Sequence, residues 1–182
     1  MVLNESLSAR AMSTREDSWH VLVRSAQTGD AMAMHELLHR LEPMVGAWCG
    51  PIALSDAADA AQETLTIVFR KLGGLSDPER LHGWVRRIAI RSAVRIARAR
   101  SAAEPAPADW LEQVPARDDP ELRTDVLSVL RRLVPEQRAV LVLRHIEGLS
   151  DREIAAALGI AESTVRSRLF RARRHFRREW QQ

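Results

Sequence analysis

The chain has 182 residues, of which 46% are hydrophobic, and its formal net charge is +3 at pH 7. This length allows one medium-sized domain or two small ones. Aromatic side chains make up only 4% of the chain and tyrosine is absent, which argues against a β-rich aromatic core. The single cysteine, Cys49, excludes an intrachain disulfide and indicates a buried thiol.

Apolar residues recur with helical spacing along the chain, and no long stretch alternates apolar and polar residues as a strand would. The pattern predicts an all-α fold. The sequence shows neither a secretory signal peptide nor an apolar run of membrane-spanning length. We therefore expect a soluble, cytoplasmic protein with no direct membrane insertion.

The first half of the chain is predicted to hold a terminal tail and four helices. Residues 1–17 are polar and weakly patterned, which is typical of a flexible tail. Helices are expected over four ranges: 19–28, 30–45, 55–72 and 80–100. Gly50 and Pro51 predict a turn or irregular connection at 48–54, and the composition of 73–79 predicts a loop.

Two of these helices have charged faces. The third shows a compact polar and acidic patch, formed by Asp56, Asp59, Gln62 and Glu63. The fourth has an arginine ridge between two apolar flanks, formed by Arg87, Arg91, Arg95 and Arg98. The simplest account is a solvated acidic face and a ridge that pairs with acids of neighbouring helices. The alternative is that both faces bind partners.

Residues 101–120 hold four of the eight prolines, are rich in alanine, and carry five acidic residues against one basic residue. This composition predicts a flexible linker. It divides the chain into an N-terminal helical domain at 18–100 and a C-terminal one at 121–182.

The C-terminal domain is predicted to end in a helix-turn-helix. Helices are expected at 121–133 and 135–145, and a third at 151–158. Ser150 and Glu153 have the spacing of a capping box, and Gly159 suits the left-handed position that ends a helix. Ser163 or Thr164 is predicted to cap the last helix.

The last helix has an apolar stripe and a basic face. The stripe consists of Val165, Leu169, Ala172 and Phe176. The opposite face gathers Ser163, Arg166, Ser167, Phe170, Arg171 and Arg174. Seven arginines and no acidic residue lie between Ser163 and Arg178, so the helix repels itself unless a polyanion is near. The pattern predicts a recognition helix for the major groove, and the alternative is a solvated basic face.

Three stretches, in this order and spacing, resemble bacterial RNA polymerase sigma factors of the extracytoplasmic-function (ECF) class. They are DAADAAQETLTIVFRKL, RLHGWVRRIAIRSAVRIARAR and LVPEQRAVLVLRHIEGLSDREIAAALGIAESTVRSRLFRARRHFR. The resemblance covers roughly residues 18–100 and 121–178. It implies a sigma-2-like helical bundle that reads and melts the −10 element, and a sigma-4-like helix-turn-helix domain that reads the −35 element.

The resemblance implies an RNA polymerase specificity subunit that is not an enzyme and has no catalytic residue, metal or cofactor. Its implied partners are core RNA polymerase, through the β′ clamp helices and the β flap, promoter DNA, and an anti-sigma factor. The implied polymerase-binding residues are Asp56, Asp59, Gln62 and Glu63. The implied −10 residues are Leu75, Ser76, Asp77, Trp84, Arg87, Arg91 and Arg95. The implied −35 residues are Ser163, Thr164, Arg166, Ser167, Phe170, Arg171 and Arg174.

The chain departs from the family pattern on the arginine ridge. The family usually has asparagine where Arg91 stands and commonly aspartate where Arg95 stands. Asparagine both donates and accepts hydrogen bonds, whereas arginine only donates. The −10 base preference of the family therefore does not carry over directly.

Two other functions compete with the sigma-factor interpretation. His35-Glu36-Leu37-Leu38-His39 matches the HExxH pattern of zinc peptidases, in which two histidines four residues apart bind the metal. No third ligand stands at a recognised spacing, although Glu42 and Cys49 are near. The second competitor is a free-standing helix-turn-helix regulator, which the C-terminal half alone does not exclude.

Overall fold

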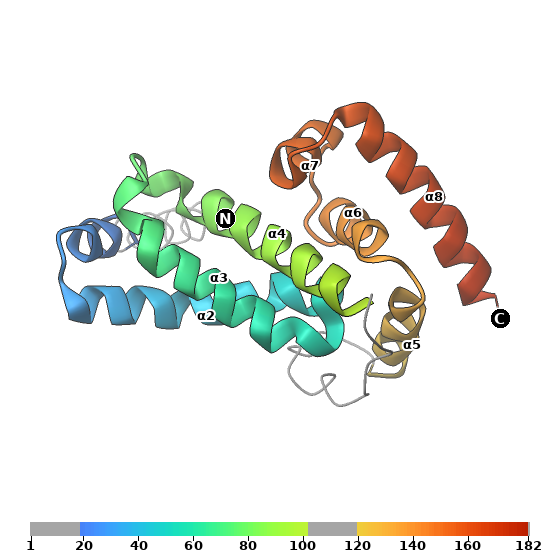
Figure 1. Cartoon of the computed structure of the whole chain (residues 1–182), viewed down its shortest axis with the longest axis horizontal. Coiled ribbons are helices and arrows are strands. Elements are labelled where there is room, and N and C mark those ends of the chain that lie inside the picture. The colour runs from blue at the N-terminus through green and yellow to red at the C-terminus, as the bar shows by residue number, and fades with distance from the viewer. Residues whose placement is uncertain (1–18, 102–119, 182) are drawn as a thin grey trace, which may run out of the picture.

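A computed structural model describes residues 19–101 and 120–181 (Figure 1). Residues 19–27 form a helix, and the longer helices that follow are α2 (Ala31–Ala53), α3 (Ala57–Lys71), α4 (Leu81–Ser101), α5 (Pro120–Arg131), α6 (Pro135–His145), α7 (Asp151–Leu158) and α8 (Glu162–Trp180). Short 3-10 turns lie at Leu54–Asp56, Leu72–Gly74 and Pro78–Arg80. The described residues include no strand, so the predicted all-α fold is confirmed. The predicted tail at 1–17 and nearly all of the predicted linker lie outside the described residues.

The helices pack as two neighbouring groups (Figure 1). Helices α2, α3 and α4 contact one another, and α8 contacts α5, α6 and α7. Apolar residues every four positions place one side of α4 in the core: Leu81, Val85, Ala89, Ala93 and Ala97. Within the two described ranges, no helix combines the length and the apolar character that crossing a membrane requires.

The turn predicted at 48–54 is wrong, because α2 continues through Gly50 and Pro51 to Ala53. A proline inside a helix removes one backbone hydrogen bond. Here the loss is offset by burial, since Cys49 and Ile52 on either side of it are fully buried. The helix ends at Leu54, which has a φ of 59° and donates its backbone N–H to Gly50.

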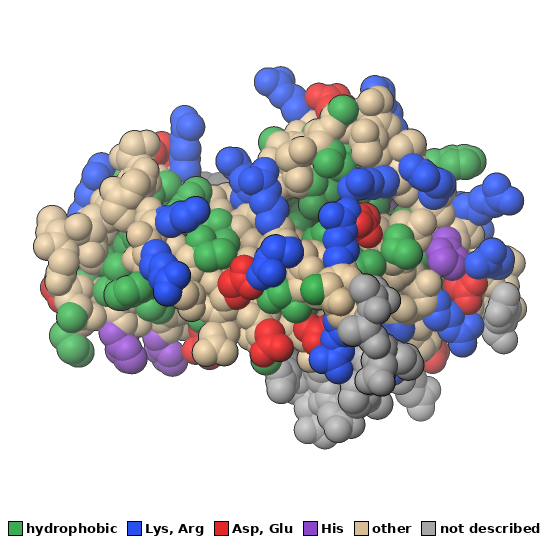
Figure 2. Space-filling view, in the orientation of Figure 1, with side chains coloured by type: hydrophobic (Ala, Val, Ile, Leu, Met, Phe, Trp, Pro, Cys, Tyr) green, Lys and Arg blue, Asp and Glu red, His purple; other side chains and the backbone are tan. Residues whose placement is uncertain are grey.

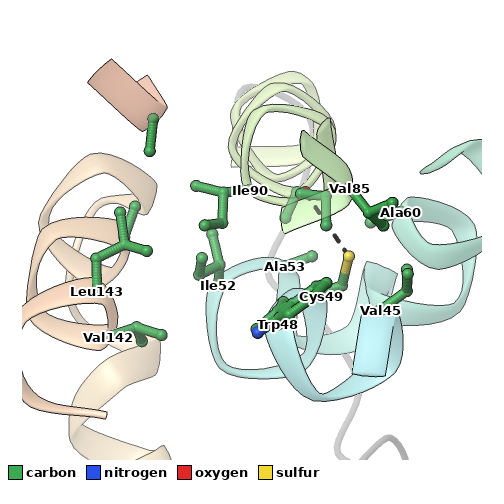
Figure 3. Close-up of a cluster of buried hydrophobic side chains, with 14 of the residues drawn as sticks. Val45, Trp48, Cys49, Ile52, Ala53, Ala60, Val85, Ile90, Val142 and Leu143 are labelled. Carbon is green, nitrogen blue, oxygen red and sulfur yellow. Dashed lines mark hydrogen bonds between the residues drawn. The ribbon is translucent and has the colours of Figure 1, made fainter. Parts of the chain in front are cut away.

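The hydrophobic core continues from one group of helices into the other. Ile52 of α2 and Ile90 of α4 face Val142 and Leu143 of α6 (Figure 3). All four side chains are at most 4% exposed. In the described structure the two groups therefore share one continuous core, and the predicted division into two domains stays a prediction.

Cys49 lies in this shared core, as its solitary occurrence predicted (Figure 3). Its side chain is 0% exposed, and its Sγ lies 3.7 Å from the carbonyl oxygen of Ala89. Burial raises the pKa of the thiol to about 12, although a hydrogen bond with Thr64 acts in the opposite direction. The thiol therefore stays neutral at physiological pH.

Candidate nucleic-acid interface

On the α7 side, the turn between α7 and α8 has the geometry that the sequence predicts. The hydroxyl of Ser150 accepts from the backbone N–H of Glu153 at 3.3 Å, and the Glu153 carboxylate accepts from the backbone N–H of Ser150 at 2.8 Å. These two bonds form the predicted capping box. Gly159 ends α7 with a φ of 70°, the left-handed conformation that glycine adopts without steric cost.

On the α8 side, the turn differs from the prediction. Helix α8 begins at Glu162 after Ala161, and no side chain caps it. Ser163 and Thr164 therefore lie inside the first turn, and the predicted cap at either residue is wrong. Val165 is 0% exposed, and its burial fixes where the helix starts relative to α7. This core contact outweighs a cap that would contribute about 1 kcal/mol.

The two faces of α8 match the prediction. Val165, Leu169 and Ala172 are buried, and Phe176 packs against the same core. The predicted −35 residues are exposed on the other side except for the half-buried Thr164: Ser163, Arg166, Ser167, Phe170, Arg171 and Arg174. Phe170 is 69% exposed, and a large apolar side chain in this basic face suits contact with a sugar or a thymine methyl. Figure 2 shows Lys and Arg side chains along the α8 edge and along the junction with α4.

Hydrogen bonds from the helix at residues 19–27 anchor the predicted −10 loop. Gln27 donates its side-chain amide to the carbonyls of Leu72 and Leu75, at 2.9 Å and 2.7 Å. Leu75 is buried, and its carbonyl accepts from Gln27, so Leu75 anchors the loop to the core. Asp77 accepts from the backbone N–H of Glu79 at 3.0 Å and starts the turn at Pro78–Arg80.

The rest of the −10 set lies along or beside this loop. Ser76 and Arg87 are exposed, and Trp84 is half-buried against the core. A tryptophan in this position contributes to the core and also presents one edge to the surface next to the loop. Arg87 thus presents an exposed charge in the first two turns of α4, the helix that follows the loop.

The rest of the arginine ridge is occupied within the chain. Arg91 donates its Nε to the carbonyl of Ala157 at 2.8 Å and its Nη2 to that of Ala156 at 3.3 Å. Arg95 pairs with Glu63 of α3, and Arg98 pairs with Glu136 of α6. The pairing with acidic residues that the simplest account foresaw is therefore present at Arg95 and Arg98, whereas Arg91 binds backbone carbonyls.

Ion pairs with arginines of α4 engage two of the four residues in the acidic patch of α3. Asp56 is only 6% exposed and pairs with Arg100 at 2.8 Å, so it stabilises the fold and does not face solvent. Glu63 is held by Arg95. Asp59 and Gln62 remain exposed.

A groove of about 760 Å³ runs between α2 and α3, beside the exposed part of this patch. Leu65 and Phe69 line the groove, and Phe69 is 57% exposed. The predicted site residues did not include Phe69. Phe69 lies two turns after Gln62 on the same face of α3 and lines the same groove, so the helical spacing could have indicated it.

The HELLH stretch lies on α2, where its polar side chains contact other side chains of the same helix. Glu36, the residue that would activate water in a peptidase, pairs with Arg40 at 2.6 Å. The rings of His35 and His39 stack with centroids 6.5 Å apart, and His39 faces Glu42 at 3.8 Å. Nowhere in the described parts of the chain do three His, Cys, Asp or Glu residues group so that they could hold a metal ion.

Comparison with known proteins identifies the family. The family described as "Sigma-70, region 4" matches residues 123–176. The chain is similar to the ECF RNA polymerase sigma factor SigE of Mycolicibacterium smegmatis, with 39% identity over 132 residues, 67% of this chain and 51% of that protein. It thus spans about half the length of that relative. It is also similar to the ECF RNA polymerase sigma-E factor of Escherichia coli K12, with 30% identity over 84% of this chain and 89% of that protein. The chain belongs to the ECF sigma factors.

The fold of this ECF sigma factor is shared with a solved relative. The sigma factor RpoE of Bartonella quintana, solved in complex with the anti-sigma factor NepR, has 22% identity and a TM-score of 0.62. The match covers 81% of this chain and 96% of that chain. Sigma factors are transcription initiation factors and not enzymes, so membership decides against both the zinc peptidase and the free-standing regulator.

Sequence reasoning missed three polar residues that position the site. Gln27 holds the loop, as described above. Arg138 is 5% exposed and donates its Nε to the carbonyl of Ile52 at 2.9 Å. Glu147 accepts from the indole of Trp48 at 3.1 Å and pairs with Arg86 at 3.3 Å. Each of these contacts joins residues more than forty positions apart, which helical periodicity does not report.

Proposed function

We propose that this ECF sigma factor binds core RNA polymerase and directs initiation at promoters whose −35 duplex and melted −10 strand it reads. The observation that carries the proposal is α8, whose arginines and Phe170 form one exposed face while its apolar stripe is buried in a helix-turn-helix. Such a helix fits the major groove, where its first turns reach base edges.

Within α8, two kinds of DNA contact are proposed. Arg166, Ser167 and Arg171 lie in the first half of the helix and are assigned to base edges, since arginine binds guanine O6 and N7 bidentately. Phe170 is assigned to a sugar or a thymine methyl. Ser163 and Thr164 at the start of the helix and Arg174 further along it are assigned to phosphates, which position the protein without specifying sequence.

For the −10 element, the loop at 75–77 and Trp84 are proposed to hold an unstacked base. Taking a base out of the stack costs a few kcal/mol, roughly, and stacking together with main-chain hydrogen bonds offsets this. Arg87, Arg91 and Arg95 are proposed to contact the phosphates of the melted strand.

For core polymerase, the proposed surface is the exposed part of α3 together with the neighbouring groove. Asp59, Gln62 and Glu63 offer acidic and hydrogen-bonding groups to the β′ clamp helices, and Phe69 in the groove adds an apolar contact. Asp56, which the resemblance placed in this surface, is left out of the proposal because it is buried in its ion pair with Arg100. The β flap is proposed to bind the C-terminal helices.

An anti-sigma factor is a further proposed partner, supported by the complex in which the Bartonella relative was solved. Since its polymerase is cytoplasmic, the sigma factor is proposed to act in the cytoplasm.

The proposal is tested by transcription in vitro with core polymerase on fragmented genomic DNA, with start sites mapped. Initiation at defined sites that share two upstream sequence elements is expected. Transcripts that start at the same sites without the sigma factor, or no transcripts on any template, would overturn it.

A further inference from the structure

The helix at residues 19–27, which we call the first helix, lies beside the predicted −10 loop (Figure 1). Val23 and Ala26 bury its inner side in the core. At its start, the ring of Trp19 meets that of His82 edge-on, with ring centroids 5.0 Å apart. Because His82 belongs to α4, the first helix is fixed to the element that directly follows the loop.

The first helix ends in a hydrogen-bonded stop. The backbone N–H groups of Gly29 and Asp30 donate to the carbonyls of Ala26 and Ser25, both at 3.2 Å. Gly29 has a φ of 96°, and this pair of bonds is a Schellman motif. The Asp30 carboxylate also accepts from the Ser25 hydroxyl at 3.0 Å and caps α2. The last turn of the first helix, which carries Gln27, is therefore fixed relative to α2.

The side-chain amide of Gln27 donates twice to the loop. Its Nε2 donates to the carbonyls of Leu72 and Leu75 at 2.9 Å and 2.7 Å. From the preceding turn, Arg24 donates its Nη2 to the carbonyl of Ser76 at 3.4 Å. The first helix thus binds three loop carbonyls, and both hydrogens of the Gln27 amide are used for this purpose.

The direction of a carbonyl fixes the direction of the N–H group that follows it. The peptide bonds of the described residues are trans, and in a planar trans peptide the C=O and the next N–H point in opposite directions. The carbonyl of Leu75 points to Gln27, so the N–H of Ser76 points away from Gln27. Within the described structure, neither this N–H nor that of Asp77 has a hydrogen-bond partner. The exposed loop therefore presents an unpaired donor on its outer side.

We propose that Gln27 is a positioning residue for reading the −10 element, because it orients the loop so that the N–H of Ser76 donates to an acceptor atom of the unstacked base. The inference rests on the proposed function, which assigns this loop to such a base, and it adds the first helix to the −10 site. Arg24 holds the loop at a second point and places an exposed cation beside it. A fixed donor discriminates between bases, since a base without an acceptor at that point leaves the bond unmade.

The test uses holoenzyme made with the full chain and a promoter library that keeps one −35 element and randomises the −10 element. Gln27→Met preserves the length of the side chain and removes both donors. Transcript abundances give the ratio between the preferred base and the other bases at each −10 position. We expect this ratio to fall about five-fold at one position in Gln27→Met and to keep its wild-type value elsewhere, since a hydrogen bond contributes roughly this factor.

The matched control is Gln137→Met in α6. Gln137 is also half-buried, and the substitution removes its hydrogen bond with His175 at 3.0 Å. This variant should retain every base preference, and Gln27→Lys, which can again donate to the loop carbonyls, should recover most of the lost discrimination. A lower transcript yield with unchanged ratios in Gln27→Met would show a merely structural role and overturn the inference. Equal loss of discrimination in both Gln→Met variants would overturn it as well.

Amide hydrogen exchange in the free protein tests the same geometry without polymerase. In the wild type, the N–H of Leu75 is bonded within the loop and should exchange slowly, whereas those of Ser76 and Asp77 should exchange fast. Gln27→Met should speed exchange at Leu75, and Gln137→Met should not. Slow exchange at Ser76 in the wild type, or an unchanged rate at Leu75 in Gln27→Met, would overturn the inference. Exchange as expected, together with no −10 base preference in wild-type holoenzyme, would instead refute the proposed function, so the two failures are distinguishable.

Discussion

Arg138 connects the two helix groups with a single side chain. Its guanidinium is 5% exposed and donates to the carbonyls of Ile52, Leu133 and Leu130 at 2.9, 3.0 and 3.4 Å. Burial lowers its pKa to about 10, and the nearby charges of Glu136 and Asp56 act in the opposite direction. The group therefore remains charged at neutral pH, and the carbonyls satisfy its donors.

Replacing Arg138 with Met should destabilise the protein by about 2–5 kcal/mol, because buried carbonyls lose their donor and the side chain loses its partners. Urea unfolding followed by circular dichroism measures the change. Arg152→Met on the exposed side of α7 is the control and should stay within about 0.5 kcal/mol of wild type. Equal stability of both variants would show that the Arg138 contacts contribute nothing.

Cys49 offers a test of burial and of pH dependence together. Burial raises its thiol pKa from 9.0 to about 12, so the folded state disfavours the thiolate that the unfolded chain forms above pH 9. The contribution of the thiol is therefore fully present below pH 9 and is lost as the pH rises towards 12. The difference in unfolding free energy between wild type and Cys49→Ala should be constant up to pH 9. Above pH 9 the wild type should lose stability relative to the variant.

The same thiol should react with a maleimide at neutral pH only after denaturation, since the reagent needs an accessible thiolate. Rapid modification of the native protein would contradict the buried position of Cys49.

At the scale of elements, the α7–α8 turn tolerates a side chain at Gly159 poorly. Gly159→Ala places a side chain in a left-handed conformation and against Arg91, and should cost about 1–2 kcal/mol. Gly73→Ala is the matched control, because nothing lies within 4 Å of its added Cβ and its φ is not left-handed. Thermal unfolding distinguishes the two, and an unchanged melting temperature for Gly159→Ala would contradict the turn as described.

Helix α3 is the element expected to bind polymerase. Asp59→Asn combined with Glu63→Gln should lower affinity for core polymerase by roughly five-fold, with the largest effect at low salt, because rim charges act mainly on association. Fluorescence anisotropy of labelled protein with core enzyme measures this. Glu79→Gln combined with Glu162→Gln changes the charge equally at exposed positions outside α3 and should bind as wild type does. An equal loss in both variants would point to net charge instead of this surface.

The elements also show what the sequence could predict. The capping box, Gly159 and the stripe on α8 were predictable because each depends on residues a few positions apart. The continuation of α2 through Gly50 and Pro51 and the uncapped start of α8 were not. In both cases the burial of neighbouring side chains outweighs a local preference, and burial depends on helices distant in sequence.

On the scale of the whole molecule, the exposed −35 residues on α8 were predictable from helical periodicity and charge. That Arg95 and Arg98 each pair with an acidic residue was foreseen as one account of the ridge. Their partners were not foreseen, because Glu63 and Glu136 come from two other helices. The contacts of Arg91 with α7 required knowledge of how the two helix groups meet. The arrangement of the two groups is thus what the sequence left open, together with the two helix boundaries named above.

The measurement that tests the central claim most directly is a footprint of the holoenzyme on a promoter taken from the mapped start sites. DNase protection should cover the −35 element, and permanganate should detect unpaired thymines at the −10 element in the same complex. Arg171→Ala should weaken the −35 protection by about 1–3 kcal/mol on the matched sequence and much less on a −35 element altered at the contacted base. Protection of the −35 duplex without melting at −10, or equal effects of Arg171→Ala on both sequences, would contradict the account.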